Sequence, residues 1–103
     1  MRLAISWVFA TSPDDSLRDG GKAVHLAQEA MRISNRRIPL LFRTLAAAYA
    51  EAGDFSKAIQ TAQEGLELAT SNGNPNLATE LQGNISLYQE QRPLRDPSLT
   101  DGN

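Results

Sequence analysis

Residues 19–33 read DGGKAVHLAQEAMRI, and residues 54–68 read DFSKAIQTAQEGLEL. The two stretches align without a gap, 35 residues apart, and six of their fifteen positions are identical. A period in the range of about 20–50 residues is typical of repeat arrays, in which each unit buries its apolar face only against its neighbours. The duplication therefore indicates an interaction scaffold assembled from copies of one unit.

An amphipathic segment, residues 39–52, precedes the second copy. Its apolar side chains recur every three or four positions, as they do on one face of a helix. They are Leu41, Phe42, Leu45, Ala46 and Tyr49. Pro39 suits the first helical position, where its missing N–H is not needed. Gly53 is placed to end this helix, and Asp54 is placed to cap the next, which we expect to run to about residue 71.

The rest of the chain extends this helical pattern in both directions. After a break at residues 71–74, Asn74 can cap a further helix, predicted over residues 75–92. Upstream, residues 2–11 are predicted to be helical, followed by a long inter-helix loop at residues 12–18. The last stretch, residues 93–103, holds two prolines and a glycine without apolar periodicity. We expect it to be a disordered tail.

The spacing Phe42-x-x-Leu45-Ala46-x-x-Tyr49, with Ala58 nine residues further on, resembles a tetratricopeptide repeat. The layout around the first copy is similar to C-terminal tetratricopeptide segments of longer bacterial proteins. The resemblance implies an all-α fold, a right-handed α-superhelix of antiparallel helix hairpins over residues 1–92. It divides this domain into a first repeat (residues 1–38), a second repeat (residues 39–74) and a capping helix (residues 75–92).

In that family the first helix of each hairpin lines a concave face, which implies a surface that binds a protein or peptide segment. The resemblance places six residues of this chain on that face. They are Arg43, Ala47, Ala50, Glu51, Thr79 and Gly83. The alternative, given equal weight, is that these residues are ordinary packing and solvent positions.

The N-terminal helix suggests a second function, self-assembly. Residues 3–10 are apolar almost all the way round, whereas a terminal repeat normally carries a polar outer face. Ile5, Val8 and Phe9 are therefore predicted to form the edge of a homodimer. The alternatives are cover by an upstream repeat of a longer chain, or packing of Phe9 under the loop at residues 12–18. A secretory signal is the weaker interpretation, because such signals span about 15–30 residues.

Nothing in the sequence indicates an enzyme, a metal site or a cofactor site. The chain has one histidine, His25, and no cysteine, so few nucleophiles and metal ligands are available. The net charge of −2 does not favour nucleic-acid binding. No run approaches the roughly 18 apolar residues of a membrane span. We therefore expect a non-catalytic protein in the cytoplasm, or the soluble C-terminal part of a larger protein.

Overall fold

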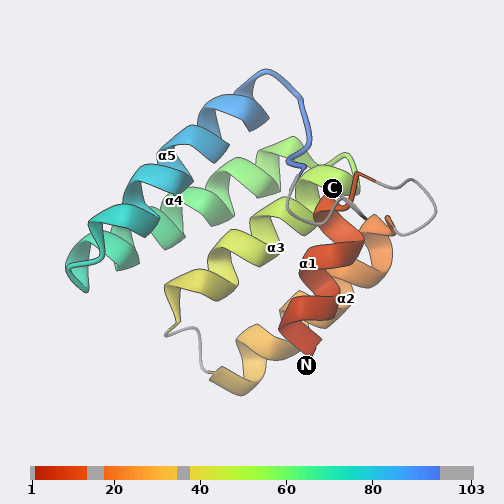
Figure 1. The fold of residues 1–103 in the computed structure, drawn as a ribbon, viewed down its shortest axis with the longest axis horizontal. Coiled ribbons are helices and arrows are strands. Elements are labelled where there is room, and N and C mark those ends of the chain that lie inside the picture. The colour runs from red at the N-terminus through yellow and green to blue at the C-terminus, as the bar shows by residue number, and fades with distance from the viewer. Residues whose placement is uncertain (1, 14–17, 35–37, 96–103) are drawn as a thin grey trace, which may run out of the picture.

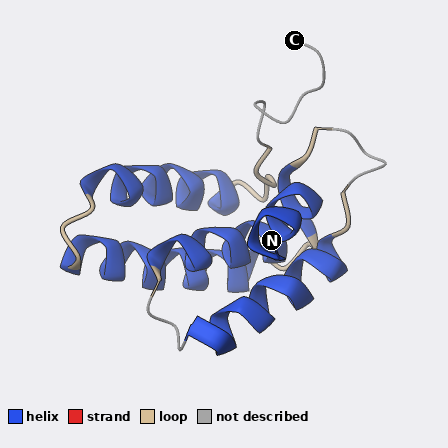
Figure 2. Ribbon diagram, turned by 60° about the horizontal axis from the view of Figure 1, so that its bottom comes forward, coloured by secondary structure: helices blue, strands red, loops and turns tan. Residues whose placement is uncertain are grey.

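The computed structural model describes residues 2–13, 18–34 and 38–95, with the backbone alone for residues 2–6. Within these ranges the chain forms five helices and no strand (Figures 1 and 2). The helices are α1 (Arg2–Thr11), α2 (Gly20–Ser34), α3 (Pro39–Glu51), α4 (Phe55–Ser71) and α5 (Pro75–Gln89). The prediction of an all-α chain is therefore confirmed for the described residues. The capping helix ends at Gln89, three residues earlier than predicted.

Helix α3 is the centre of the arrangement. It packs against α1 and α2 on one side and against α4 on the other (Figure 1). Helix α1 runs along α3 with a broad contact, whereas α5 packs on α4 and touches α3 only sparsely. The seam between α3 and α5 is therefore the most loosely packed junction beside the central helix.

The residues shared by the two copies have the same structural roles in both. The side chains of Asp19 and Asp54 each accept a hydrogen bond from the backbone N–H three residues on, at 3.1 Å. These bonds satisfy one of the unpaired donors at the start of a helix. The two shared alanine pairs are fully buried in both copies. They are Ala23 and Ala27 in α2 and Ala58 and Ala62 in α4.

Helices α3, α4 and α5 end with the same hydrogen-bond pattern. The backbone N–H groups of Asp54, Asn74 and Arg92 each donate to the carbonyl five residues earlier, at 2.9–3.2 Å. This pattern needs a left-handed residue just past the helix, and glycine adopts that conformation without steric cost. Gly53 and Gly73 occupy the position after α3 and α4, with φ of 88° and 71°. After α5 the same position is occupied by Gln91, with φ of 59°.

Close approach between helices depends on residues with small side chains. A Cβ atom at Gly65 of α4 would lie 2.6 Å from the Cβ of Phe42, and one at Gly20 would lie 2.7 Å from the backbone nitrogen of Ala52. Real Cβ atoms do not approach other atoms so closely. Both helix contacts therefore require glycine at these positions.

The predicted disordered tail includes residues that pack against the helical body. Leu94 packs against buried residues of the helical body, and the Arg95 guanidinium forms an ion pair with Glu51 at 2.8 Å. For residues 93–95 the prediction of a disordered tail is therefore wrong, while residues 96–103 lie outside the described residues. The predicted loop at residues 12–18 is described only at its ends. There Arg18 donates to the Ser12 carbonyl at 3.0 Å.

The two helix glycines Gly65 and Gly83 should respond in opposite ways to alanine. We expect Gly65→Ala to lower the free energy of unfolding by about 1–2 kcal/mol, because Phe42 or a backbone must move. Gly83 lies in α5 with open space where its Cβ would be. Gly83→Ala should therefore raise stability by about 0.5–1 kcal/mol through helix propensity. Urea unfolding monitored by circular dichroism measures both, and a Gly65→Ala variant as stable as wild type would contradict the close approach of α3 and α4.

Candidate functional site

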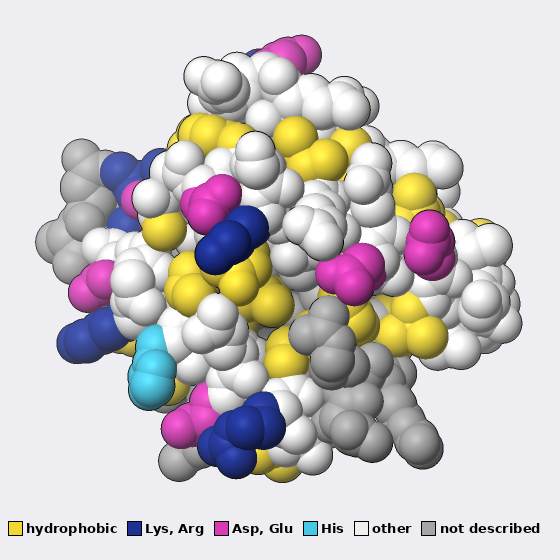
Figure 3. All heavy atoms as spheres, turned by 180° about the vertical axis from the view of Figure 1, so that it is seen from behind, with side chains coloured by type: hydrophobic (Ala, Val, Ile, Leu, Met, Phe, Trp, Pro, Cys, Tyr) yellow, Lys and Arg dark blue, Asp and Glu magenta, His cyan; other side chains and the backbone are white. Residues whose placement is uncertain are grey.

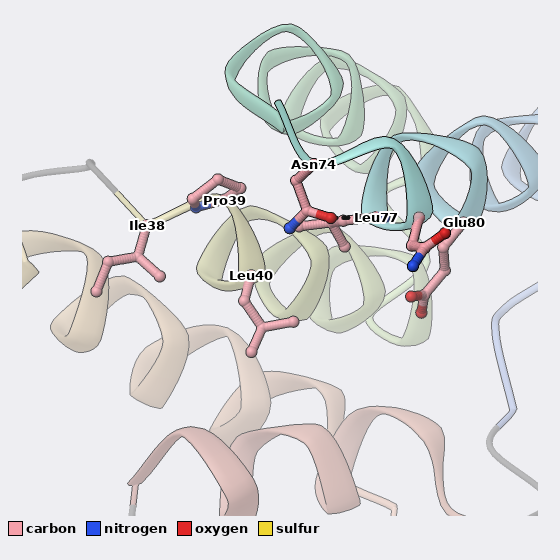
Figure 4. Close-up of a pocket in the computed structure, with 7 residues that line it drawn as sticks. Ile38, Pro39, Leu40, Asn74, Leu77 and Glu80 are labelled. Carbon is pink, nitrogen blue, oxygen red and sulfur yellow. Dashed lines mark hydrogen bonds between the residues drawn. The ribbon is translucent and has the colours of Figure 1, made fainter. Parts of the chain in front are cut away.

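A groove of about 420 Å³ opens between the N-terminal ends of α3 and α5. One side comes from the start of α3 and the other from the turn before α5 and from α5 itself (Figure 4). Its lining residues are Ile38, Pro39, Leu40, Asn74, Asn76, Leu77 and Glu80. Ile38 and Leu40 are 48% and 38% exposed, although both are large apolar side chains. The sparse contact between α3 and α5 accounts for the opening.

The groove combines an apolar lining with polar groups at its border. Leu40 and Leu77 contribute apolar surface from the two helices, and Leu77 is itself largely buried. The Asn74 side chain is held in place because its Oδ1 accepts the Leu77 N–H at 3.2 Å, drawn as a dashed line in Figure 4. Asn76 and Glu80 complete the polar border. Such a lining suits an apolar side chain with polar backbone groups around it.

Arg43 lies next to the groove, where it is bonded to the lining residue Glu80. Its Nη1 atom lies 2.8 Å from Oε2 of Glu80, which joins α3 to α5 by a charge-assisted hydrogen bond. Its guanidinium carbon lies 4.0 Å from the centre of the Trp7 ring, a stacked cation–π contact with α1. One side chain of the central helix therefore ties together α1, α3 and α5.

The seam beyond Arg43 holds polar atoms without hydrogen-bond partners. Nε of Arg43, Nδ2 of Asn84 and the hydroxyl of Tyr88 are buried and unpaired among the described residues. Burial raises the pKa of the Tyr88 phenol; the positive charge of Arg43 opposes this shift and the carboxylate of Glu80 adds to it. A buried donor without a partner costs about 1–3 kcal/mol. The seam between α3 and α5 is therefore sparsely packed, and several of its buried polar atoms lack hydrogen-bond partners.

The structure corrects the predicted concave face at two positions. Ala47 and Ala50 are almost completely buried, so neither lines an open surface. The reason is that α1 and residues 93–95 cover this side of α3, which two alanines allow by leaving room for close neighbours. Glu51 is mostly buried and faces Arg18 at 3.5 Å and Arg95 at 2.8 Å.

The other three predicted residues of the concave face are at least partly accessible. Arg43 borders the groove through its bond to Glu80. Thr79 and Gly83 lie on the exposed surface of α5, and neither lines the groove. None of the six predicted residues lines the groove. Arg43 contacts one lining residue, Glu80, while Thr79 and Gly83 are exposed elsewhere on α5.

The predicted self-association edge is less exposed than the sequence suggested. Val8 and Phe9 are half-buried, and Phe9 packs against a cluster of buried alanines from α1, α2 and α3. The ammonium of Lys22 also lies 5.5 Å from the centre of the Phe9 ring. The side chain of Ile5 lies outside the described residues. Among the described side chains, the exposed large apolar residues are instead Ile33, Ile38 and Leu40.

Sequence reasoning missed Ile38, Leu40 and Leu77 as residues that line the groove. A signal for the first two was present, because Ile38 and Leu40 flank Pro39 and lie off the apolar stripe of Leu41 and Phe42. Apolar residues off the buried stripe of an amphipathic helix are candidates for surface contacts. Leu77 gave no such signal, since it belongs to the buried stripe of its own helix.

No group of residues that could hold a metal ion is found in the part of the chain that the structure describes. None of its acidic residues or its histidine gathers into a group of three that could hold a metal ion. His25 is exposed and lies beside Gln28, Glu29 and Arg32 on the surface of α2 (Figure 3). No described helix has the length and apolar character needed to cross a membrane.

Comparison of the chain with protein-family models, with curated proteins and with solved structures finds no match. The groove between α3 and α5, its exposed apolar residues and the Arg43–Glu80 pair are therefore the observations from which a function is inferred.

Tyr88 provides a test of the seam at alkaline pH. Its folded-state pKa lies above the value of about 10 expected in the unfolded chain, so it contributes stability that is present below pH 10 and lost as pH rises further. We expect Tyr88→Phe to be as stable as wild type or more stable near pH 8, because the lost hydroxyl has no partner. Above pH 10 the free energy of unfolding of the Tyr88→Phe variant should fall less steeply with pH than that of wild type.

The matched control is Tyr49→Phe, which retains Tyr88 and should retain the steep alkaline loss. It removes a hydroxyl that does have a partner, Gln28 at 2.9 Å. Urea unfolding at several pH values measures all three proteins. Equal slopes for wild type and Tyr88→Phe above pH 10 would show that the Tyr88 phenol is not buried in solution.

Proposed function

We propose that this chain is a non-catalytic helical scaffold that binds a protein or peptide segment, and that the α3–α5 groove is its contact surface. The observation that carries the proposal is the exposure of Ile38 and Leu40 beside an open groove. Large exposed apolar residues gathered at a concave surface usually mark an interaction site. Glu80, which lines the groove, and its partner Arg43 supply charged groups beside these apolar residues.

The arrangement of hairpins is consistent with a tetratricopeptide-like array. Helices α1 and α3, the first helices of the two proposed hairpins, pack against each other, and each also packs against its own partner. The shared alanines fill the close contacts within and between hairpins. In this proposal α5 is the capping helix, and the array is a right-handed superhelix whose inner side carries the groove.

The expected ligand is a segment with one apolar side chain that enters between Leu40 and Leu77. Amide groups of Asn74 and Asn76 at the border can hydrogen-bond to a ligand backbone. The groove is small compared with the area of a stable protein interface, so the affinity should be modest.

The groove is tested by selecting binders from a displayed peptide library on the wild-type chain. We expect Leu40→Glu to weaken the selected peptides at least tenfold, because it places a carboxylate in the apolar lining. Ile33→Glu is the matched control, since Ile33 is 67% exposed but is not a lining residue. That variant should bind within about twofold of wild type.

Amide chemical-shift changes on peptide addition locate the contact directly. The proposal expects them at residues 38–43 and 74–80. Equal binding to the Leu40→Glu and Ile33→Glu variants would rule out the groove as the contact surface. A library from which no peptide is enriched on wild type would argue against a peptide-binding role.

Self-assembly through α1 is the second candidate, supported by the partial exposure of Val8 and Phe9. If it is correct, sedimentation equilibrium should show a concentration-dependent dimer, and Val8→Glu should weaken it at least tenfold without loss of helix. Gln63→Glu on the exposed surface of α4 is the control and should leave the dimer intact. A wild type that stays monomeric at high micromolar concentration excludes this candidate.

A further inference from the structure

The chain turns back on itself after α5. Gln91 is the one non-glycine residue with positive φ in the described ranges, at 59°. The following residue, Arg92, donates its backbone N–H to the Leu87 carbonyl at 3.2 Å, which closes the turn. A left-handed glutamine is strained, and such strain persists only where surrounding contacts hold it. The contacts of Leu94 and Arg95, which follow this turn, keep Gln91 in that conformation.

Leu94 is the apolar contact. It packs against a cluster of buried residues from α3, α4 and α5, which includes Ala50 and Tyr88, and also against a cluster from α1, α2 and α3, which includes Ala10 and Ala47. Leu94 therefore lies between the two halves of the molecule, on the side of α3 where the sequence predicted a binding surface. Figure 1 shows the chain after α5 descending toward the ends of α1 and α3.

Arg95 is the polar contact. Its Nη1 atom lies 2.8 Å from Oε1 of Glu51, the last residue of α3. The other Glu51 oxygen faces Nε of Arg18 at 3.5 Å, and Arg18 is itself held by the carbonyls of Ser12 and Pro13. The mostly buried Glu51 carboxylate thus faces Arg18 on one side and forms an ion pair with Arg95 on the other, where the short contact lacks the geometry of a hydrogen bond. The carboxylate is therefore placed to bind a cationic group at the position that the Arg95 guanidinium occupies.

We propose that residues 93–95 act as an internal ligand, seated on the C-terminal half of the inner face, and that a separate peptide with an apolar residue followed by arginine competes for this seat. The inference rests on the proposed function, because it names a ligand for the face that carries the groove. The Leu94 side chain fills the apolar position and the Arg95 guanidinium pairs with Glu51. A ligand with the same pair of groups satisfies both positions.

Occupancy by the tethered segment lowers the apparent affinity for a free peptide. A segment on a short linker has an effective concentration of roughly millimolar. The apparent dissociation constant rises by the inverse of the fraction of molecules in which the seat is empty. A seat empty in about one molecule in ten therefore weakens binding of a free peptide about tenfold.

The probe is a fluorescein-labelled peptide with the sequence of residues 91–98, QRPLRDPS, titrated into full-length protein and followed by anisotropy. The full chain carrying Leu94→Asp and Arg95→Glu has its seat emptied, and it should bind this peptide at least tenfold more tightly than wild type. The milder Arg95→Ala variant should give an intermediate increase. Circular dichroism on each variant checks that the helices are retained.

Arg92→Glu is the matched control. It makes the same charge change three residues earlier, where the exposed guanidinium pairs only with Glu90 at 3.2 Å among the described ion pairs. This variant should bind the peptide as weakly as wild type does. An equal gain in Arg92→Glu and in the variant that carries Leu94→Asp and Arg95→Glu would overturn the proposal, because it would reflect added negative charge and not an emptied seat.

The chemistry of the seat is tested within the emptied variant. Adding Glu51→Gln should weaken the peptide at least tenfold, and so should a peptide in which the residue equivalent to Arg95 is glutamate. An emptied variant that binds the peptide no better than wild type overturns the proposal, as does binding that is unchanged by Glu51→Gln. Adding Leu40→Glu should leave this peptide unaffected, so failure here is distinguishable from failure of the α3–α5 groove.

Discussion

The close packing around α3 is the constraint on which the rest of the structure depends. Its buried residues include four alanines, Ala46, Ala47, Ala48 and Ala50, which are almost completely buried and face different neighbours. Interiors are packed at the density of organic crystals, so the distance between two helices is set by the side chains between them. The alanines on α3, together with Gly65 opposite Phe42 and Gly20 opposite Ala52, bring three helices close enough to share one central element. The space left for α5 beside α3 is then filled only in part.

The helices and their caps were predictable because they depend on local chemistry. Asp54 caps α4 and Gly53 ends α3 as expected, since capping and left-handed turns involve residues only a few positions apart. The duplicated alanines also had a local signature, a fixed spacing in two aligned copies. The residue-level prediction of the concave face was less accurate because it needs distances between elements. Whether the side of α3 that carries Ala47 is open depends on α1 and on Leu94.

Long-range pairs carried no signal in the sequence. Arg43 and Glu80 are 37 positions apart, and Trp7 is 36 positions before Arg43, yet these three side chains meet at one point. The charge of Arg43 was visible in the sequence, but its partners were not foreseeable from spacing. The same holds for Glu51 and Arg95, whose pairing gives a specific place to a stretch that composition alone marked as disordered.

Helix α5 is the least anchored helix among the described residues, so it should be the first part of the molecule to unfold. It rests on α4, while its direct contact with α3 is sparse and includes the Arg43–Glu80 pair, beside the unpaired Nδ2 of Asn84 and hydroxyl of Tyr88. Proteins open in cooperative units, and units with few buried contacts open at lower free energy than the whole. Partial unfolding should therefore begin with α5 and residues 93–95 together. One such event would expose the α3 surface between the two halves while α1 to α4 stay folded.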